Sequence, residues 1–463
     1  MIKNVILITI DTLRADHLSC YGYYRVTSPT IDRLAKEGIL FKSAFSNGPW
    51  TPFSFPSILT STYPLQFPFN FHLSSDRTTI AEVLKKNGYS TAAFHSNPYL
   101  SRFYGYDRGF DVFSDFLFTE DRIKIGGLLS FSQKVKVKFS KILNEKTRNF
   151  ISKLIKIVNI GSKTWKKLLE FDQKYIEEAG NINKKVFKWL KKVKEPFFIW
   201  VHYMDVRMGY IPPKQCLEYF KKFTSSLPDE TKVRNLCEKN YRHIYLRKQN
   251  FSDEEIKLFI DLYDAEIRYV DEHIKILINE VYGMNLTYDT LIVITADHGE
   301  EFLEHGDIAH KPKLYDELLH VPLIFHAPGL GNGIVDDLVS LIDLAPTILD
   351  ILSIEKPKEW LGNSLLPLIE GKKKRTNGGI ISEVLHDGKR KICYRTEKWK
   401  LIFNEKENNY ELYDLERDSK EINNVAGKYP DVVKYLSFKI KEHIMLKSRE
   451  KIRDKIKKLK EKV

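Results

Sequence analysis

The sequence is poor in cysteine and has no long apolar run. Its 463 residues include four cysteines and no Cys-x-x-Cys pair, which argues against a zinc ribbon and against a disulfide framework. No stretch approaches the roughly 20 apolar residues that a membrane-spanning helix requires. The apolar run near the N-terminus is also too short for a signal-peptide core. We therefore expect a cytoplasmic protein.

Low hydrophobicity, the mark of a disordered chain, is also missing. Hydrophobic residues make up 43% of the chain and aromatic residues 13%, which is enough for a sizeable core, whereas charged residues stay at 29%. The length exceeds that of one small domain, so we expect a large domain with a smaller one appended.

Acidic residues are outnumbered, and the net charge is +13. An ordinary lysine-rich surface explains this charge, as would an acidic substrate or an anionic membrane surface. No motif for nucleic-acid recognition is present, so we expect no nucleic-acid partner. The segment 122–169 holds thirteen Lys or Arg and one acid, Glu145. It is interpreted as a solvated helical insertion, with a basic lid or a membrane-surface helix as the alternative. The oligomeric state is not predicted.

Short apolar runs alternate with helical patterns along the first three quarters of the chain. This order predicts an α/β fold with a large, mostly parallel sheet sandwiched by helices. From residue 379 to 415 short strands with turn signals predict a small antiparallel sheet. The expected domains are 1–355 with a basic helical insertion at about 120–190, an α+β subdomain at 356–430, and a basic C-terminal helix at 431–463. The expected strands of the large sheet are 5–10, 39–44, 90–94, 197–202, 290–295 and 323–326.

Polar residues follow several of these strands directly. Asp11 ends the first strand, and Asp297 and His298 follow the strand at 290–295. Ligands of open α/β sheets bind beyond the carboxyl ends of the strands, and carboxylate and imidazole groups there can share one divalent cation. The alternatives are a helix N-cap for Asp11 and a capped loop for the Asp-His pair.

A hydroxyl side chain begins the next helical pattern. Thr51 fits the N-cap position and Pro52 the first helical position. Taken alone, Thr51 is a plain cap. With metal ligands nearby, coordination would lower the pKa of its hydroxyl and make it a nucleophile.

Three segments together resemble the sulfatase family of the alkaline phosphatase superfamily. They are NVILITIDTLRADHLSCYG, WTPFSFPSILTSTYP and TADHGEEFLEHG, and they occur in the family's order. The later segments LYDELLHVPLIFHAPG and YELYDLERDSKEINN are similar to sulfatases too. The resemblance implies an alkaline-phosphatase-like fold, hydrolysis of sulfate esters, and a divalent cofactor (Ca, Mg, Mn or Zn).

The resemblance assigns roles to individual residues. Asp11, Asp297 and His298 match metal ligands, and Thr51 matches both a ligand and the nucleophile. Thr51 lies nine residues before Thr60, as the family spacing requires, which favours it over Ser54. Many sulfatases carry a second aspartate where this chain has Thr12.

Further matches concern the substrate. Lys311, Arg207 and Asn97 fall where the family binds the transferred group. Arg207 replaces a family histidine, and its guanidinium can bind an oxyanion. The candidates for protonating the leaving group are His202, His305 and His310.

Two departures from the family pattern open other activities. Sulfatases convert a Cys or Ser to formylglycine, which Thr51 cannot yield, and Phe55 stands where those enzymes carry an arginine. With a threonine at the nucleophile position, the pattern resembles threonine-nucleophile phosphodiesterases of the same superfamily. The alternatives are therefore a phosphodiester or phosphonate monoester hydrolase, a phosphoryl transferase, or a relative that only binds an anionic glycan or lipid.

Overall fold

The structure is a computed structural model, and it describes residues 2–67, 71–116, 177–219, 230–246, 250–284, 286–372 and 378–460. The basic segment 122–169 lies outside these ranges, so its predicted roles stay predictions. Of the expected insertion, the helix α7 (Ala179–Leu190) is described. Among the described residues, no helix is both long and apolar enough to cross a membrane.

An eight-stranded sheet forms the centre of the molecule. Its strand order is β10-β2-β9-β6-β1-β5-β3-β4, and every neighbouring pair is parallel except the two pairs that involve β9. The prediction of a large, mostly parallel sheet is confirmed. The strands are β1 (Asn4–Ile10), β2 (Ile39–Phe45), β3 (Ser90–Phe94), β4 (Val112–Ser114), β5 (Phe197–Tyr203), β6 (Thr290–Ala296), β9 (Leu323–His326) and β10 (Gly333–Ser340).

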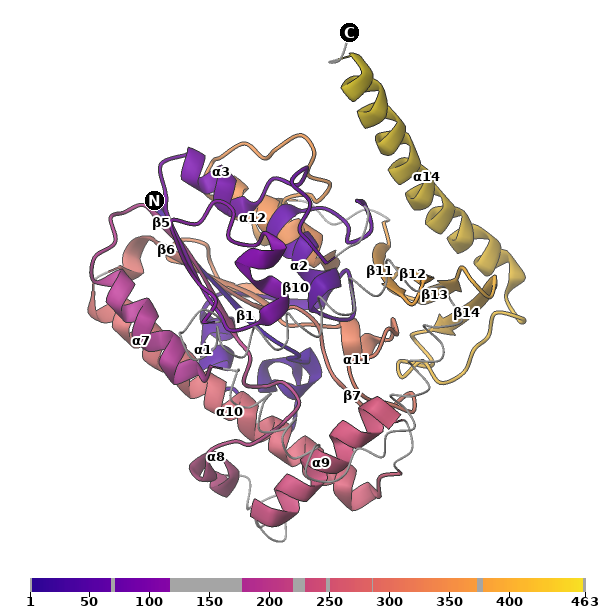
Figure 1. Cartoon of the computed structure of the whole chain (residues 1–463), viewed down its shortest axis with the longest axis horizontal. Helices are drawn as coiled ribbons and strands as arrows, with labels where there is room; N and C mark the ends of the chain where they lie inside the picture. The colour runs from indigo at the N-terminus through magenta and orange to yellow at the C-terminus, as the bar shows by residue number, and fades with distance from the viewer. Residues whose placement is uncertain are drawn as a thin grey trace, which may run out of the picture.

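Helices cover both faces of this sheet (Figure 1). Every residue of β1, β5 and β6 is buried, which explains why these strands are almost continuously apolar. One face carries α1 (Pro29–Glu37), α7 and α10 (Asp253–Gly283). The other carries α2 (Thr51–Thr60), α3 (Ile80–Lys86) and α12 (Leu344–Ile351).

A second, antiparallel sheet lies C-terminal to the first, as expected. It runs in the order β11-β12-β13-β14, and α14 (Pro430–Lys460) packs on β12 and β13. Its strands are β11 (Ile380–His386), β12 (Lys389–Arg395), β13 (Trp399–Asn404) and β14 (Asn409–Asp414). The shorter elements are β7 (Glu301–Phe302), β8 (Ile308–Ala309), α8 (Lys214–Tyr219), α9 (Glu230–Leu246), α11 (Asp316–Leu319) and α13 (Leu366–Ile369).

A charged group around the buried residues Lys400 and Glu421, which we call the joint cluster, ties the second sheet to α11. It consists of Asp316, Arg395, Lys400 and Glu421. The Lys400 ammonium lies 2.8 Å from carboxylate oxygens of both Asp316 and Glu421, and Arg395 lies 3.1 Å from Asp316. Two acids thus face two bases, so the cluster balances its own charge.

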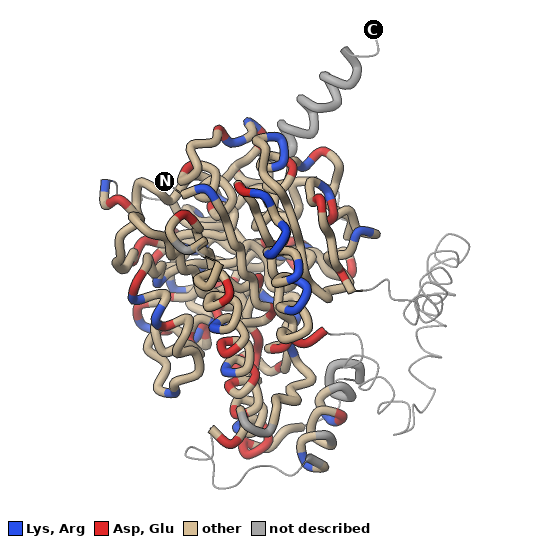
Figure 2. The backbone as a smooth tube through the Cα atoms, turned by 90° about the vertical axis from the view of Figure 1, so that its left-hand side faces the viewer, with Lys and Arg blue, Asp and Glu red and all other residues tan. Residues whose placement is uncertain are grey.

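Basic and acidic residues are interspersed along the described backbone (Figure 2). Most of the positive net charge comes from the segment 122–169, which lies outside the described residues, so the interpretation of that charge as an ordinary solvated surface stays a prediction.

Candidate active site

The three strands that end in polar residues are neighbours in the sheet. β1 lies between β6 and β5, so residues that follow these strands meet at one sheet edge. One donor atom from each of Asp11, Asp297 and His298 lies within 4.8 Å of the others, and all three residues are buried. We call these residues the metal cluster. Sequence reasoning predicted this convergence from strands far apart along the chain.

The His298 ring is oriented by its own backbone. Its Nδ1 lies 2.9 Å from the carbonyl oxygen of Gly299, so in the neutral ring Nδ1–H donates there and the Nε2 lone pair faces the acids. Nε2 lies 3.3 Å from Asp11 Oδ1 and 3.4 Å from Asp297 Oδ2. Apart from this contact, both oxygens lack a hydrogen-bond partner among the described residues. Two carboxylates and one imidazole are a donor set that suits a divalent metal ion.

The electrostatics of the cluster also favour a cation. Burial, together with the charge of Asp11, raises the pKa of Asp297 to about 7. Burial would raise the pKa of Asp11 too, but His298, His202 and Arg207 outweigh it and hold that pKa well below its ordinary value. The two acids raise the pKa of His298 to about 9 despite its burial. Without an ion the cluster balances its charge by keeping a proton, and a bound metal ion would replace that proton.

Thr12 does not replace the missing aspartate as a ligand. Its hydroxyl donates to the carbonyl of Val206 at 3.1 Å, and its backbone N–H points to Asp297 Oδ1 at 3.4 Å. The φ angle of Thr12 is 59°, a left-handed conformation that is costly for a β-branched residue. Through its backbone N–H, this strained turn helps to hold Asp297 of the metal cluster in place.

Gly299 is required for close packing against α11. A Cβ at this position would lie 2.0 Å from the carbonyl oxygen of Glu317. The N–H of Gly299 donates to the carbonyl of Leu318 at 2.9 Å. The loop that holds His298 is therefore packed directly onto α11.

Thr51 faces the metal cluster. Its Oγ1 lies 3.5 Å from His298 Nε2 and accepts a hydrogen bond from Asn97 Nδ2 at 3.4 Å. The prediction that Thr51 is the N-cap is wrong: Trp50 holds that position and Thr51 is the first helical residue. Its hydroxyl is therefore not used as a cap. The hydroxyl of Ser54 donates to the carbonyl of Thr51 at 3.2 Å, within its own helix.

His202 is held by a buried hydrogen-bond chain. Trp200 Nε1–H donates to Thr9 Oγ1 at 2.9 Å, and Thr9 Oγ1 lies 2.9 Å from His202 Nδ1. His202 Nε2 has no hydrogen-bond partner among the described residues. Burial lowers the pKa of His202 to about 4, although Asp11 acts in the opposite direction. The ring is therefore neutral at pH 7, and its unused nitrogen is available for proton transfer.

The other two candidate histidines have different surroundings. The rings of His310 and His298 are 4.5 Å apart, and His310 Nδ1 lies 3.4 Å from Glu300 Oε2. His305, in contrast, has both ring nitrogens engaged, by Glu317 Oε1 at 2.7 Å and by the carbonyl of Glu421 at 3.1 Å. The structure places His305 beside the joint cluster, so its predicted role as a proton donor stays a prediction.

Arg207 and Lys311 are the two predicted cationic contacts with the substrate. Arg207 is near enough to the metal cluster to lower the pKa of Asp11. Lys311 is half-buried and follows His310 in the loop after β8. Its predicted contact with the transferred group stays a prediction.

Sequence reasoning assigned no role to Thr9, Trp200 and Glu300. Glu300 is fully buried, and its Oε1 has no hydrogen-bond partner among the described residues. A signal was present for Thr9, since it is a polar residue within an apolar strand. A partner for Trp200 could not be read from the sequence, because it depends on the pairing of β1 with β5.

Known proteins are similar to this chain over most of its length. The family model described as Sulfatase matches residues 3–354, and the model described as N-sulphoglucosamine sulphohydrolase, C-terminal, matches residues 304–448. The chain belongs to the sulfatase family. Arylsulfatase K of Canis lupus familiaris is 25% identical over 95% of this chain and 82% of its own length.

Solved structures share the sulfatase fold over almost the whole chain. A structure in complex with its substrate D-glucosamine-2-N,6-O-disulfate has a TM-score of 0.72 at 19% identity, covering 97% of this chain and 99% of its own. The phosphonate monoester hydrolase of Agrobacterium radiobacter has a TM-score of 0.70 at 19% identity and covers 96% of both chains. The chain is thus a sulfatase-like ester hydrolase.

Proposed function

We propose that this protein is a metal-dependent hydrolase of sulfate esters in which Thr51 is the nucleophile. The observation that carries the proposal is the position of the Thr51 hydroxyl, 3.5 Å from the nitrogen of His298 that faces Asp11 and Asp297. A nucleophile and a ligand set in contact are what metal-assisted ester hydrolysis requires.

The metal cluster would hold the cation through Asp11, Asp297 and His298, with Thr51 as a further ligand. A bound divalent cation would supply Lewis acidity, lowering the pKa of the Thr51 hydroxyl and offsetting charge on the ester oxygens.

The residues of the chain would divide the reaction between them. Thr51 Oγ1 attacks the sulfur atom, an S–O bond to threonine forms, and the bond to the leaving alcohol breaks. The neutral ring of His202 or His310 accepts the Thr51 proton and then gives it to the departing alkoxide. Water then attacks the same sulfur, releases sulfate and restores the Thr51 hydroxyl. Asn97 orients Thr51, and Arg207 and Lys311 offset the charge of the transferred group.

Phosphonate monoester or phosphodiester hydrolysis is the second candidate function. It is favoured by the threonine itself, which attacks without conversion to an aldehyde, and by the similarity of fold to a phosphonate monoester hydrolase. The same residues would serve, with phosphorus in the place of sulfur.

The test compares 4-nitrophenyl sulfate, a nitrophenyl phosphodiester and a nitrophenyl phosphonate side by side, with Mn²⁺, Zn²⁺, Mg²⁺ or Ca²⁺ added. Thr51→Ala should lower turnover of the preferred ester by at least about 1,000-fold. The matched control is Ser54→Ala, whose hydroxyl bonds within its own helix, and it should keep its activity. Turnover that survives Thr51→Ala removes the nucleophile from the proposal. Binding of sulfate without turnover of any ester would favour the non-catalytic relative.

A further inference from the structure

A chain of buried polar groups beside the metal cluster ends in an open nitrogen of His202. Trp200 Nε1 lies 2.9 Å from Thr9 Oγ1, and Thr9 Oγ1 lies 2.9 Å from His202 Nδ1. All three residues are fully buried. The parallel register of β1 with β5 places Thr9 beside His202. The pairing of these two strands therefore decides which groups meet in the chain.

The direction of these hydrogen bonds follows from the indole. An indole N–H can only donate, so Thr9 Oγ1 accepts from Trp200. The Thr9 hydroxyl then has one proton to give. Among the described residues its acceptors are His202 Nδ1 at 2.9 Å and the carbonyl oxygen of Val201 at 3.5 Å. An O–H···O bond normally spans about 2.5–3.0 Å, so the Thr9 hydroxyl donates to His202 Nδ1.

This direction fixes the tautomer of the His202 ring. Burial lowers the pKa of His202 to about 4, so the ring is neutral at pH 7 and has one N–H and one lone pair. Because Nδ1 accepts from Thr9, the proton is on Nε2. Nε2 is buried and has no hydrogen-bond partner within the part of the chain that the structure describes. A buried N–H without a partner is costly, so this one is suited to an oxygen of a ligand.

Aromatic neighbours keep both rings of the chain from turning. Phe55 lies edge-on to His202, with ring centroids 5.1 Å apart, and it contacts the Trp200 indole at 5.2 Å. His95 contacts the same indole at 5.1 Å. The indole and the imidazole are thus held in the orientations that the hydrogen bonds require.

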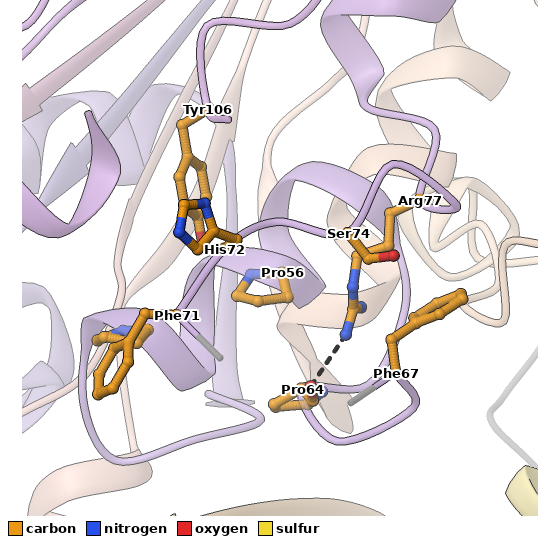
Figure 3. A pocket seen from close by; sticks show the side chains of 9 residues that line it. Pro56, Pro64, Phe67, Phe71, His72, Ser74, Arg77 and Tyr106 are labelled. Carbon is orange, nitrogen blue, oxygen red and sulfur yellow. Dashed lines mark hydrogen bonds between the residues drawn. The ribbon is translucent and has the colours of Figure 1, made fainter. Parts of the chain in front are cut away.

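The helix that carries Phe55 is itself held on another face. Pro56 of α2 lines the pocket in Figure 3, where buried Arg77 donates to the carbonyl of Pro64 at 2.9 Å. This bond fixes the loop that follows α2. Thr51 and Phe55 lie one turn apart on the helix. The same element therefore positions the candidate nucleophile and the ring that packs on His202.

His310 has the opposite tautomer. Its Nδ1 lies 3.4 Å from Glu300 Oε2. A carboxylate only accepts hydrogen bonds, so in the neutral ring Nδ1 carries the proton and Nε2 keeps its lone pair. The neutral His310 ring can therefore accept a proton at Nε2, whereas His202 already has one there and would first have to exchange its tautomer.

We propose that Thr9 and Trp200 fix His202 as a hydrogen-bond donor to an oxygen of the ester bound at the metal cluster, while His310 alone carries the proton. The Nε2–H bond of His202 stays intact. The Thr51 proton passes to His310 Nε2 and from there to the departing alkoxide. Thr9 and Trp200 are positioning residues, since they act through the His202 ring. The proposal rests on the proposed function, and it divides two tasks between the two histidines.

Nitrogen-15 NMR of histidine-labelled protein tests the tautomer without any turnover. The His202 ring, identified by the signals missing from His202→Gln, should carry its proton on Nε2 at pH 7. Inorganic sulfate that saturates the Zn²⁺-loaded protein should then shift the Nε2 signal. A proton on Nδ1 would overturn the proposal, and so would an Nε2 signal that saturating sulfate leaves unchanged. The tautomer is read without a ligand, so this result is distinct from failure of the proposed function.

Substitutions at Thr9 separate positioning from packing. Thr9→Val keeps the shape but removes the hydroxyl, and it should lower kcat/KM for the preferred nitrophenyl ester by about 10- to 100-fold. Thr9→Ser keeps the hydroxyl and should stay within about threefold of wild type. A packing role predicts the reverse order, because serine leaves a gap and valine does not, and that order would overturn the proposal.

The matched control is Thr290→Val, which should keep its activity. Thr290 is a buried threonine whose hydroxyl bonds to the carbonyl of Leu286, at the end of β6 far from the metal cluster. Should Thr9→Val not fold, Trp200→Phe gives a second test. It removes the indole donor, so Thr9 can accept from Nδ1 and both tautomers of His202 should appear. An unchanged single tautomer in this variant would overturn the proposal.

Discussion

The joint cluster and the metal cluster both bring carboxylates together with basic side chains, yet they balance charge differently. In the joint cluster the acids Asp316 and Glu421 face the bases Lys400 and Arg395. The metal cluster brings together two acids and one histidine, and one carboxylate oxygen of each acid lies near the histidine Nε2.

The difference shows which cluster is complete within the protein. Buried charges are costly unless paired, and the joint cluster pairs them with its own side chains. Burial raises the pKa of one acid in each cluster to about 7, Asp297 in the metal cluster and Glu421 in the joint cluster. The clusters differ in their bases, because the metal cluster has one histidine where the joint cluster has Lys400 and Arg395. A divalent cation would add positive charge to the metal cluster, so removing an acid there and removing a base from the joint cluster should have opposite effects on the stability of the metal-free protein.

The largest effect is expected from Asp297→Asn. Loss of a ligand should lower ester turnover by at least about 1,000-fold and abolish metal binding. The metal-free protein should not be destabilised, because the change removes a buried charge next to Asp11. Metal analysis and thermal unfolding in a chelator check both statements. A large drop in the unfolding temperature of the metal-free variant would contradict the comparison.

Lys400→Met should do the reverse. It leaves half-buried Asp316 and buried Glu421 without their shared ammonium group, at a cost of about 3–5 kcal/mol in the free energy of unfolding. Folded protein should still bind one equivalent of metal ion. Urea unfolding measures the cost, and Lys398→Met, at an exposed ion pair with Glu416, is the control. Equal effects of the two lysine substitutions would mean that the joint cluster contributes no stability.

A smaller effect is expected from the metal ion itself. A cation that binds only the folded state at about 100 times its Kd stabilises it by about 2.7 kcal/mol. Wild type should therefore unfold a few degrees higher with Mn²⁺ or Zn²⁺ than in a chelator, and Asp297→Asn should show no such shift. Differential scanning calorimetry gives both values. An equal shift in the variant would indicate binding elsewhere.

The smallest effect concerns pH. Burial alone would raise the pKa of Asp316, but Arg395 and Lys400 hold it well below its ordinary value. A carboxyl group with a lowered folded-state pKa stabilises the fold above its ordinary pKa, and that contribution is lost as the pH falls. Between about pH 5 and pH 3, wild type should lose on the order of 1 kcal/mol more than Asp316→Asn. Parallel urea titrations across this range check the slope, and identical slopes would contradict it.

Much of the site could be predicted because it depends on strand ends. Asp11, Asp297 and His298 follow apolar strands, and parallel strands bring their carboxyl ends to one edge. The resemblance to sulfatases placed Thr51, because the family's nucleophile lies nine residues before the threonine matched by Thr60. The N-cap at Trp50 could not be predicted, because the sequence does not reveal that the backbone of Trp50 is extended and that the helix begins at Thr51.

The rest depended on pairings between distant segments. The hydrogen bond from Trp200 to Thr9 requires β1 and β5 to be neighbours, and the sequence of neither strand indicates which strand it pairs with. The hydrogen bonds of the His305 ring likewise depend on Glu317 in α11 and on Glu421 in the chain after β14. Sequence patterns identify which groups reach a sheet edge better than which side chains meet there.

The close approach of Gly299 to Glu317 has a consequence for where the chain can be divided. The loop bearing His298 rests on α11, and α11 is anchored through Asp316 to β13. A fragment ending at residue 355 would contain every ligand of the metal cluster but would lack this anchor. The second sheet thus supports the loop that bears His298, and a cut at residue 355 would remove that support.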